Sequence, residues 1–394
     1  MKMERTNTIL ITILLLVMVG CVGNRQSGNE GDTFITVDVI ANYPKKELIL
    51  QDFMDVEYIP LETNDEFVCQ GLVQDIGKEF IVVKNQIQDG NIFLFDRKGK
   101  GIKKINRKGQ GDEEYSNIYL WGITLDEDNR EIFVNDVFTR RILVYDLTGV
   151  FKRSFSHKDD ARYHGIYNFD RENLICYDGS EGNKGQSFAI ISKQDGSVTK
   201  EIQIPFQEKK SMWMYSRDEV NNITYGIKPE NQYTIIPYFD DWLLIEPSSD
   251  TIYSYLHDHT MMPFIARTPS VQSMDPEVFL SPNIITDRYY FMESVKKEFE
   301  FGVGGFPTTD LMYDKHKKAI FKYTVHNDDY SDKRPVNMKS RPVNDEIVTW
   351  QSLEVHQLVK SYETGELKDG KLKEIAAKLD DEDNPVIMLV KHKQ

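Results

Sequence analysis

The chain has 394 residues, of which 40% are hydrophobic and 28% are charged, and its formal net charge is -15. An apolar fraction of this size can form a core, which excludes wholesale disorder. Because 63 Asp and Glu residues outnumber 48 Lys and Arg residues, a phosphate backbone would be repelled, and we expect no nucleic-acid partner. The aromatic share of 11% favours strands over helices.

Residues 1–20 have the pattern of an export signal. Lys2 and Arg5 form a short basic segment, and the apolar run over residues 9–19 is too short to cross a bilayer, which takes about 20 residues. The segment ends in a glycine followed by Cys21, which resembles the lipobox of bacterial lipoproteins. That resemblance implies cleavage before Cys21 and a lipid group on its thiol. The alternative is an ordinary signal peptide with an incidental cysteine.

The rest of the chain divides into a tether and a folded body. Residues 22–33 are small and polar, so we expect residues 21–33 to form a flexible tether and residues 34–394 to fold. No apolar run in the body is long enough for a membrane helix, so the bilayer would be a partner through the lipid anchor alone. We therefore expect the protein in the cell envelope, on the outer membrane or facing the periplasm. Whether Cys69 and Cys176 pair is left open.

The body repeats one hairpin. Residues 92–105 contain an apolar strand, an Asp-x-x-Gly turn and an alternating strand, and residues 142–155 repeat this pattern. Looser copies begin at Phe188, Thr251 and Ala319, and each copy follows another strand-like run. Runs that are apolar at every position indicate strands covered on both faces. Four-stranded antiparallel sheets repeated radially would cover them, so we predict an all-β fold, a β-propeller.

Six blades are expected. Five hairpins are visible between residues 76 and 330, so the sixth blade must come from the two ends of the body. Pairing the ends in one sheet would close the ring and cover edges that would otherwise stay open. Insertions, for example residues 206–235 and 293–318, would account for the surplus length. The candidate strands for the closing blade are residues 34–39, 56–61, 347–350 and 386–390.

One C-terminal segment departs from the strand pattern. Leu372, Ile375, Ala376 and Leu379 have the spacing of one helix face, and residues 353–362 are a second helix candidate. Both segments lie between the last two predicted strands, so we expect a short helical insertion in the last blade. It would either cover one end of the propeller or bind a partner.

Several stretches resemble the six-bladed β-propeller lipoproteins of Bacteroidales-type bacteria, which are distantly similar to NHL-repeat and TolB-like propellers. In that family the turn after Gly111 usually reads Pro-Gly-Glu-Tyr, whereas Asp112 and Glu113 stand here. The resemblance is strong over residues 34–160 and 340–394. It implies a fold and an exported location, and it brings no catalytic residues. The stretches that carry it are residues 56–63, 95–100, 107–115 and 383–389.

No segment has the pattern of a catalytic or metal site. His257 and His259 would share a strand face, but a metal needs at least three ligands and no partner run is apparent. The acidic runs 126–129 and 380–383 lack the spacing of a calcium loop and are interpreted as solvated turns. The glycines of residues 99–111 open no helix, and no Gly-x-Ser-x-Gly elbow occurs. We therefore predict no catalytic residue, no metal ligand and no cofactor.

Three functions stay open, one of them a purely structural role in an envelope complex, which copurification would reveal. The first is a binding or scaffold module for a glycan, a peptide or an envelope protein, with residues 212–215 and 301–306 at the rim of the channel or buried against neighbouring blades. The second is a metal-dependent lyase or hydrolase centred in the channel. Three or more Asp, Glu, Asn or His side chains converging on the axis would favour the enzyme, and an aromatic or apolar axis would favour binding.

The lipid anchor is directly testable. We expect Cys21→Ser to move the protein from the membrane fraction to the soluble fraction, because the thiol that takes the lipid is removed. Cell fractionation followed by immunoblotting measures this, with Cys69→Ser as the control that should stay with the membrane. Unchanged membrane retention of Cys21→Ser would contradict the assignment.

Overall fold

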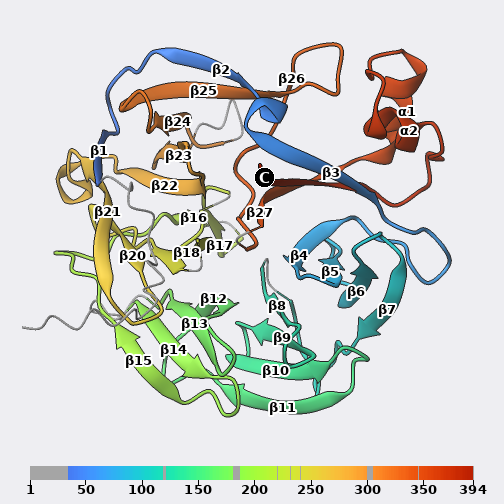
Figure 1. Cartoon of the computed structure of the whole chain (residues 1–394). Helices are drawn as coiled ribbons and strands as arrows, with labels where there is room; N and C mark the ends of the chain where they lie inside the picture. Colours follow the sequence, from blue (N-terminus) through green and yellow to red (C-terminus); the bar gives the residue numbers. More distant parts are fainter. Residues whose placement is uncertain are drawn as a thin grey trace, which may run out of the picture. The chain divides into compact units, whose positions relative to one another are not determined.

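The folded body is a ring of sheets. Within the described residues, six sheets of three or more strands follow one another around a central axis (Figure 1). The predicted signal segment, the tether and Cys21 lie outside the described residues, as does most of the glycine-rich run 301–306. None of the helices in this part of the chain is long and apolar enough to cross a membrane. The computed structural model describes residues 34–394 except 119–120, 181–186, 220, 231, 240, 300–304, 345 and 394.

The first three blades are four-stranded antiparallel sheets. In each, the strands run outward from the axis in chain order, as Figure 1 shows. The first blade contains β4 (Leu72–Ile76), β5 (Phe80–Lys84), β6 (Asn91–Asp96) and β7 (Gly101–Asn106). The second contains β8 (Ile123–Asp126), β9 (Glu131–Asp136), β10 (Arg141–Asp146) and β11 (Phe151–Ser156). The third contains β12 (Tyr163–Asn168), β13 (Asn173–Asp178), β14 (Phe188–Ser192) and β15 (Val198–Ile202).

The repeated Asp-x-x-Gly turn has the same construction in the first two blades. One carboxylate oxygen of Asp96 accepts two backbone N–H bonds within its turn, at 2.8 and 3.0 Å. Asp146 accepts two equivalent bonds at 2.8 and 3.0 Å. Gly99 and Gly149 have φ angles of 84° and 85°, a left-handed conformation that glycine adopts without strain. The sequence repeat therefore records a repeated turn geometry.

The fourth and fifth blades gain strands from the N-terminal segment. β1 (Ile35–Asp38) pairs in parallel with β21 (Met261–Thr268), and β2 (Lys45–Ile49) pairs in parallel with β25 (Ala319–Asn327). The assignment of residues 34–39 to the closing blade was wrong, because their N–H and C=O groups instead cover the open edge of the fourth blade. The fourth blade also contains β18 (Ile235–Tyr238), β19 (Asp241–Leu244), β20 (Thr251–Tyr255) and β21 (Met261–Thr268).

The fifth blade shows that residues 293–318 are not an insertion. They contain the end of β23 (Tyr289–Lys296) and all of β24 (Thr308–Asp314), which pair along their length. The alternation of apolar and polar residues does not show in this stretch, because every side chain of β23 except that of Lys296 is buried. The remaining elements here are β22 (Val278–Ile285), β25 (Ala319–Asn327) and the short β26 (Arg334–Pro335), with the 3-10 turns Leu50–Asp52 and Val271–Ser273 elsewhere in the ring.

The sixth blade joins the two ends of the body. It has three strands in the order β27 (Ile347–Leu353), β28 (Val386–His392) and β3 (Met54–Pro60), rather than the four found in the first three blades. β28 and β3 pair antiparallel over seven positions, from Val386 opposite Pro60 to His392 opposite Met54. The last strand of the chain is therefore held between an early strand and β27.

The predicted helical insertion is confirmed in this blade. α1 (Val355–Glu363) and α2 (Lys371–Ala376) lie between β27 and β28. Leu358, Leu372 and Ile375 are buried in the same apolar cluster as Tyr58 and Val386. The helices therefore cover part of the core, which accounts for their apolar face without a partner protein.

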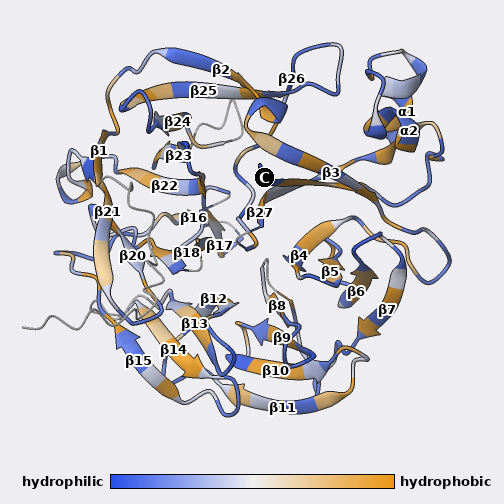
Figure 2. Ribbon diagram, in the orientation of Figure 1, coloured by the Kyte–Doolittle hydropathy of each residue, from blue (hydrophilic) through white to orange (hydrophobic). Residues whose placement is uncertain are grey.

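The hydrophobic core is divided into layers between neighbouring blades. Along β5, Ile81 and Val83 join the cluster shared with the sixth blade, whereas Val82 joins the cluster shared with the second blade. All three side chains are 0% exposed. Such burial stabilises the fold by about 1.5–3 kcal/mol per large aliphatic side chain. Figure 2 shows hydrophobic residues concentrated along strands such as β14 and hydrophilic residues in the connecting loops.

The core also contains thiol groups and a buried ion pair. Cys69 and Cys176 are both buried and free, so they form no disulfide, and burial raises the pKa of the Cys69 thiol to about 11.

The interpretation of Asp126 as part of a solvated turn is wrong. Its carboxylate is buried and pairs with Lys193 at 2.6 Å. A buried charge of this kind needs such a partner.

The closing blade supports a prediction about stability. Leu389 is 0% exposed on β28, so Leu389→Ala should lower the free energy of unfolding by about 2–5 kcal/mol through lost burial and a residual cavity. Urea denaturation followed by circular dichroism measures the change. Val150→Ala, at a side chain that is 54% exposed, is the control and should stay within about 0.5 kcal/mol of the parent. A small effect at Leu389 would contradict the closure described above.

Candidate functional site

The innermost strands are irregular at the axis. Four of them carry a register shift, in β4, β12, β22 and β27. A bulge leaves one residue outside the ladder and redirects its side chain, and bulges are frequent beside functional sites. Asn283 is 0% exposed, and neither polar atom of its amide has a hydrogen-bond partner among the described residues. The bulged residues are Gln74, His164, Asn283 and Val348.

A buried arginine lies beside these inner strands. Arg341, in the segment that leads into β27, is 6% exposed, and its guanidinium lies 4.3 Å from the ring centroid of Tyr167. Burial raises the pKa of Asp75, although nearby Arg341 acts in the opposite direction. Asp75 also accepts a 2.9 Å hydrogen bond from the backbone N–H of Leu125, which links the first and second blades. The axis thus combines charged groups with aromatic rings.

Aromatic side chains meet across the ring close to Arg341. Trp121, just before β8, lies 5.9 Å from Tyr233 and 6.0 Å from Trp350 between ring centroids. Trp121 has a φ angle of 60°, a left-handed conformation that is rare for a large side chain and costs free energy. Residues that come from the second, fourth and sixth blades therefore form one aromatic contact.

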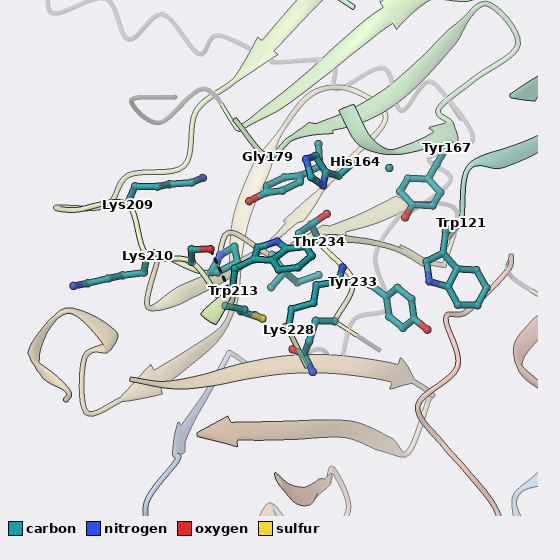
Figure 3. Close-up of a pocket in the computed structure, with 17 residues that line it drawn as sticks. Trp121, His164, Tyr167, Gly179, Lys209, Lys210, Trp213, Lys228, Tyr233 and Thr234 are labelled. Carbon is teal, nitrogen blue, oxygen red and sulfur yellow. Dashed lines mark hydrogen bonds between the residues drawn. The ribbon is translucent and has the colours of Figure 1, made fainter. Parts of the chain in front are cut away.

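A cavity of about 150 Å³ extends from these rings. Its wall includes residues of the third and fourth blades and of the insertion between them, and Figure 3 shows side chains from all three sources. The lining residues that the structure describes include no Asp or Glu, although the chain as a whole carries a net charge of -15. The aromatic lining residues are Trp121, Tyr167, Tyr177, Trp213 and Tyr233, and the basic ones are His164, Lys209, Lys210 and Lys228.

The insertion contributes a hairpin with one aromatic and basic face. β16 (Met214–Asp218) and β17 (Ile223–Ile227) pair antiparallel, and alternation places Trp213, Tyr215 and Lys228 on the same face. The Trp213 and Tyr215 rings stack with centroids 6.1 Å apart and planes 12° apart. The Lys228 Nζ lies 5.5 Å from the centroid of the Trp213 ring. A Cβ at Gly226 would lie 3.2–3.3 Å from both rings, so glycine lets them lie close to the strand.

The basic groups of the wall differ in their surroundings. Lys209 pairs with the buried carboxylate of Glu246 at 3.0 Å, and Lys210 pairs with Glu208 at 3.0 Å. Burial lowers the pKa of Lys228. Burial also lowers the pKa of His164, and the positive charge of Lys228 lowers it further. The wall therefore holds two lysines that are paired with carboxylates and two basic groups whose protonation is opposed by burial.

Sequence reasoning located part of this site. Residues 212–215 were candidates for ligand contact, and Met212 and Trp213 line the cavity. Trp121, Tyr233 and Lys228 were missed, because nothing in their local pattern shows that they meet. The strand-like alternation of residues 214–227 inside a predicted insertion was the one signal that could have pointed to the hairpin.

The histidine pair has a structural role in the turn between β20 and β21. The ring of His259 hydrogen-bonds the hydroxyl of Tyr255 at 2.9 Å. The rings of His257 and His259 stack on Phe169, with centroids 5.2 and 5.8 Å away. Across the described part of the chain, no group of three or more His, Cys, Asp or Glu side chains is placed to hold a metal ion.

Comparisons with known proteins identify relatives of this architecture. The model of a family described as a six-bladed β-propeller matches residues 24–350. A comparison with curated proteins finds no match. A solved Bacteroides fragilis NCTC 9343 protein predicted to be exported is 14% identical, with a TM-score of 0.56, and the match covers 89% of this chain and 99% of that one.

Two further solved structures are less similar. A member of the DUF4221 family from Bacteroides vulgatus ATCC 8482 is 11% identical over 87% of this chain and 98% of its own, with a TM-score of 0.45. Virginiamycin B lyase from Staphylococcus aureus is 10% identical over 66% of this chain and 96% of its own, with a TM-score of 0.33. These two likenesses carry no argument about this chain.

The electrostatics of the cavity can be measured through His164. In Lys228→Met the pKa of His164 should rise, because one of the groups that oppose its protonation is removed. Titration of the histidine ring resonances by NMR, assigned with His164→Asn, measures the shift. Lys333→Met, at a 71% exposed side chain paired with Glu47, is the control and should leave His164 unchanged. An unchanged or lowered pKa of His164 in Lys228→Met would contradict the effect of the Lys228 charge on this ring.

Proposed function

Since this chain belongs to the six-bladed β-propeller family, we propose that it is an exported, lipid-tethered binding module. Its ligand enters the cavity between the third and fourth blades. The propeller supplies a rigid frame, and the residues at the ends of the β16–β17 hairpin supply one wall of the cavity. Cys21 would carry the lipid and residues 21–33 would tether the frame to the cell envelope, on the outer membrane or facing the periplasm.

One observation carries the proposal: five aromatic and four basic side chains line one cavity. Ligand sites in proteins are mostly apolar and aromatic, with a few polar groups that fix orientation. Aromatic rings also meet at the axis, through Trp121, Tyr233 and Trp350. An axis lined by aromatic rings is the arrangement that we expect of a binding protein rather than of an enzyme.

Export and anchoring rest on separate support. Residues 1–20 have a signal pattern that ends in Cys21. The Bacteroides fragilis protein that shares the fold is also predicted to be exported. The bilayer would then be a partner through lipid, and the cavity would face a ligand outside the cytoplasm.

The binding role is tested by a ligand screen. We expect at least one member of a panel of neutral oligosaccharides, acidic oligosaccharides and short peptides to raise the melting temperature of the wild type. At a ligand concentration 100 times Kd, binding should raise the free energy of unfolding by about 2.7 kcal/mol. Trp213→Ser should abolish the ligand-induced rise in melting temperature, because the Trp213 ring lines the cavity.

Tyr225→Ser is the matched control for Trp213→Ser. Tyr225 lies on the opposite face of the same hairpin and is 53% exposed, so its loss should leave the ligand-induced gain intact. A panel without any stabilising member, or a gain that survives in Trp213→Ser, would count against binding at this cavity.

A further inference from the structure

We infer that a basic surface of the fifth blade docks on the anionic lipid headgroups of the membrane that holds the tether. This surface lies around the loop between β1 and β2 and the turn between β24 and β25. The inference rests on the lipid-anchored tether of the proposed function and adds an orientation to it. The surface, which we call the basic patch, consists of Lys45, Arg288, Lys317, Lys318 and Lys322.

Backbone contacts bring the parts of the basic patch together. β2 and β25 pair in parallel, with Lys45 opposite Lys322. The backbone N–H of Lys322 donates a 2.9 Å hydrogen bond to the carbonyl oxygen of Pro44. The backbone N–H of Lys315 donates a 3.0 Å hydrogen bond to the carbonyl oxygen of Arg288. Three segments that are far apart in the sequence therefore form one surface, next to the loop between β1 and β2 (Figure 1).

The turn between β24 and β25 holds its lysines in a defined conformation. The side chain of Asp314 is 0% exposed, and its carboxylate accepts backbone N–H bonds from His316 and Lys317 at 3.1 Å each. Asp314 also pairs with Lys46 at 2.6 Å, so its charge is neutralised beneath the surface. Lys318 has a φ angle of 50°, a left-handed conformation that is uncommon for residues other than glycine. The turn therefore places a lysine where the equivalent turns of the first two blades use glycine.

The charges of the basic patch are open to solvent. Four of its five side chains are exposed, and Lys322 is half-buried and donates a 2.9 Å hydrogen bond to the Asn42 amide. Among the described residues, none of the five has a carboxylate within 4 Å. Two carboxylates lie beside the patch, those of the half-buried Asp38 and of Asp287. Acidic residues farther away than about 8 Å are screened in physiological salt, so the patch decides how this side of an acidic chain meets an anionic plane.

An exposed apolar side chain lies next to the basic patch. Ile40 is 64% exposed in the loop between β1 and β2. It is two residues from Asn42, whose amide bonds Lys322. Apolar side chains flanked by basic ones are typical of protein surfaces that lie on membranes. Ile40 can therefore enter the headgroup region while the lysines contact the lipid phosphates.

The attachment point of the tether favours this surface over other basic surfaces. The tether of residues 21–33 would join the folded body at β1, which leads directly into the loop that carries Ile40. A segment of that length spans at most about 45 Å, which keeps this side of the ring near the bilayer. Lys98 and Lys100 are also exposed, in the turn between β6 and β7, but Figure 1 shows that turn on the opposite side of the ring from β1.

The experiment measures lysine accessibility in the lipidated protein on vesicles. One vesicle is phosphatidylcholine alone, and the other is phosphatidylcholine and phosphatidylglycerol in equal amounts. Exposed amines are labelled chemically and quantified by mass spectrometry. We expect slower labelling of Lys317 and Lys318 on the anionic vesicle, because each basic residue near such a surface shifts the docking equilibrium by about fivefold. Lys98 and Lys100 should be labelled equally on both vesicles.

A double variant links the protection to the turn between β24 and β25. In Lys317→Gln/Lys318→Gln, docking should weaken by about 25-fold, so labelling of Lys45 on the anionic vesicle should approach its rate on the neutral one. Lys98→Gln/Lys100→Gln removes two exposed lysines from the equivalent turn of the first blade. It is the matched control and should keep Lys45 protected. In wild type, about 500 mM NaCl tests the same charges without a substitution and should restore labelling of Lys45.

The possible outcomes separate docking from the anchor. Equal labelling of Lys317 and Lys318 on both vesicles, with the protein bound to both, would overturn docking and leave the anchor and the ligand cavity standing. Equal loss of Lys45 protection in the two double variants would overturn the assignment to the basic patch. Binding to the anionic vesicle alone would contradict the anchor and support the patch. Binding to neither vesicle would overturn the anchor and docking together, whereas the cavity is tested by its own ligand screen.

Discussion

The pairing of β28 with β3 is the constraint on which the rest of the structure depends. Each blade is apolar on both faces, so every sheet needs a neighbour on either side. Along β5, Ile81 and Val83 share a buried cluster with Ile387 and Leu389 of the closing blade. Without the closing pair, the first and sixth blades would each expose an apolar face and an open strand edge. Closure thus converts a row of sheets into a ring with a core between every pair.

Closing the ring has a second consequence at the axis. It brings the innermost strands together, and polar side chains link neighbouring blades there. Thr124 donates a 2.7 Å hydrogen bond to the backbone carbonyl of Ile166, and Asp75 accepts one from Leu125 at 2.9 Å. Trp121 then reaches Trp350 from across the ring. Trp121, which lines the cavity, therefore contacts the closing blade, while Trp213 and Lys228 at the ends of the β16–β17 hairpin line another part of the cavity.

The charge distribution gives that cavity its chemical character. The chain carries 63 acidic residues, yet the described residues that line the cavity are aromatic, neutral or basic. Lys209 forms an ion pair with Glu246, whose side chain is 0% exposed. This ion pair fixes the position of the Lys209 side chain at the wall of the cavity. The Lys228 Nζ lies over the Trp213 ring, 5.5 Å from its centroid.

The sequence by itself determined the fold class, the repeated hairpin and the helices after β27, because period-two and helical spacing record burial within one segment. It also indicated residues 212–215 as candidates for ligand contact, and Met212 and Trp213 line the cavity. It did not determine where residues 34–39 pair, since alternation shows that a strand has a buried face but not which edge it covers. Only the tertiary structure joined Trp121, Lys228 and His164. They come from three segments far apart in the chain, and the bulge that redirects His164 depends on its partner strand. A cavity is a property of that convergence in space.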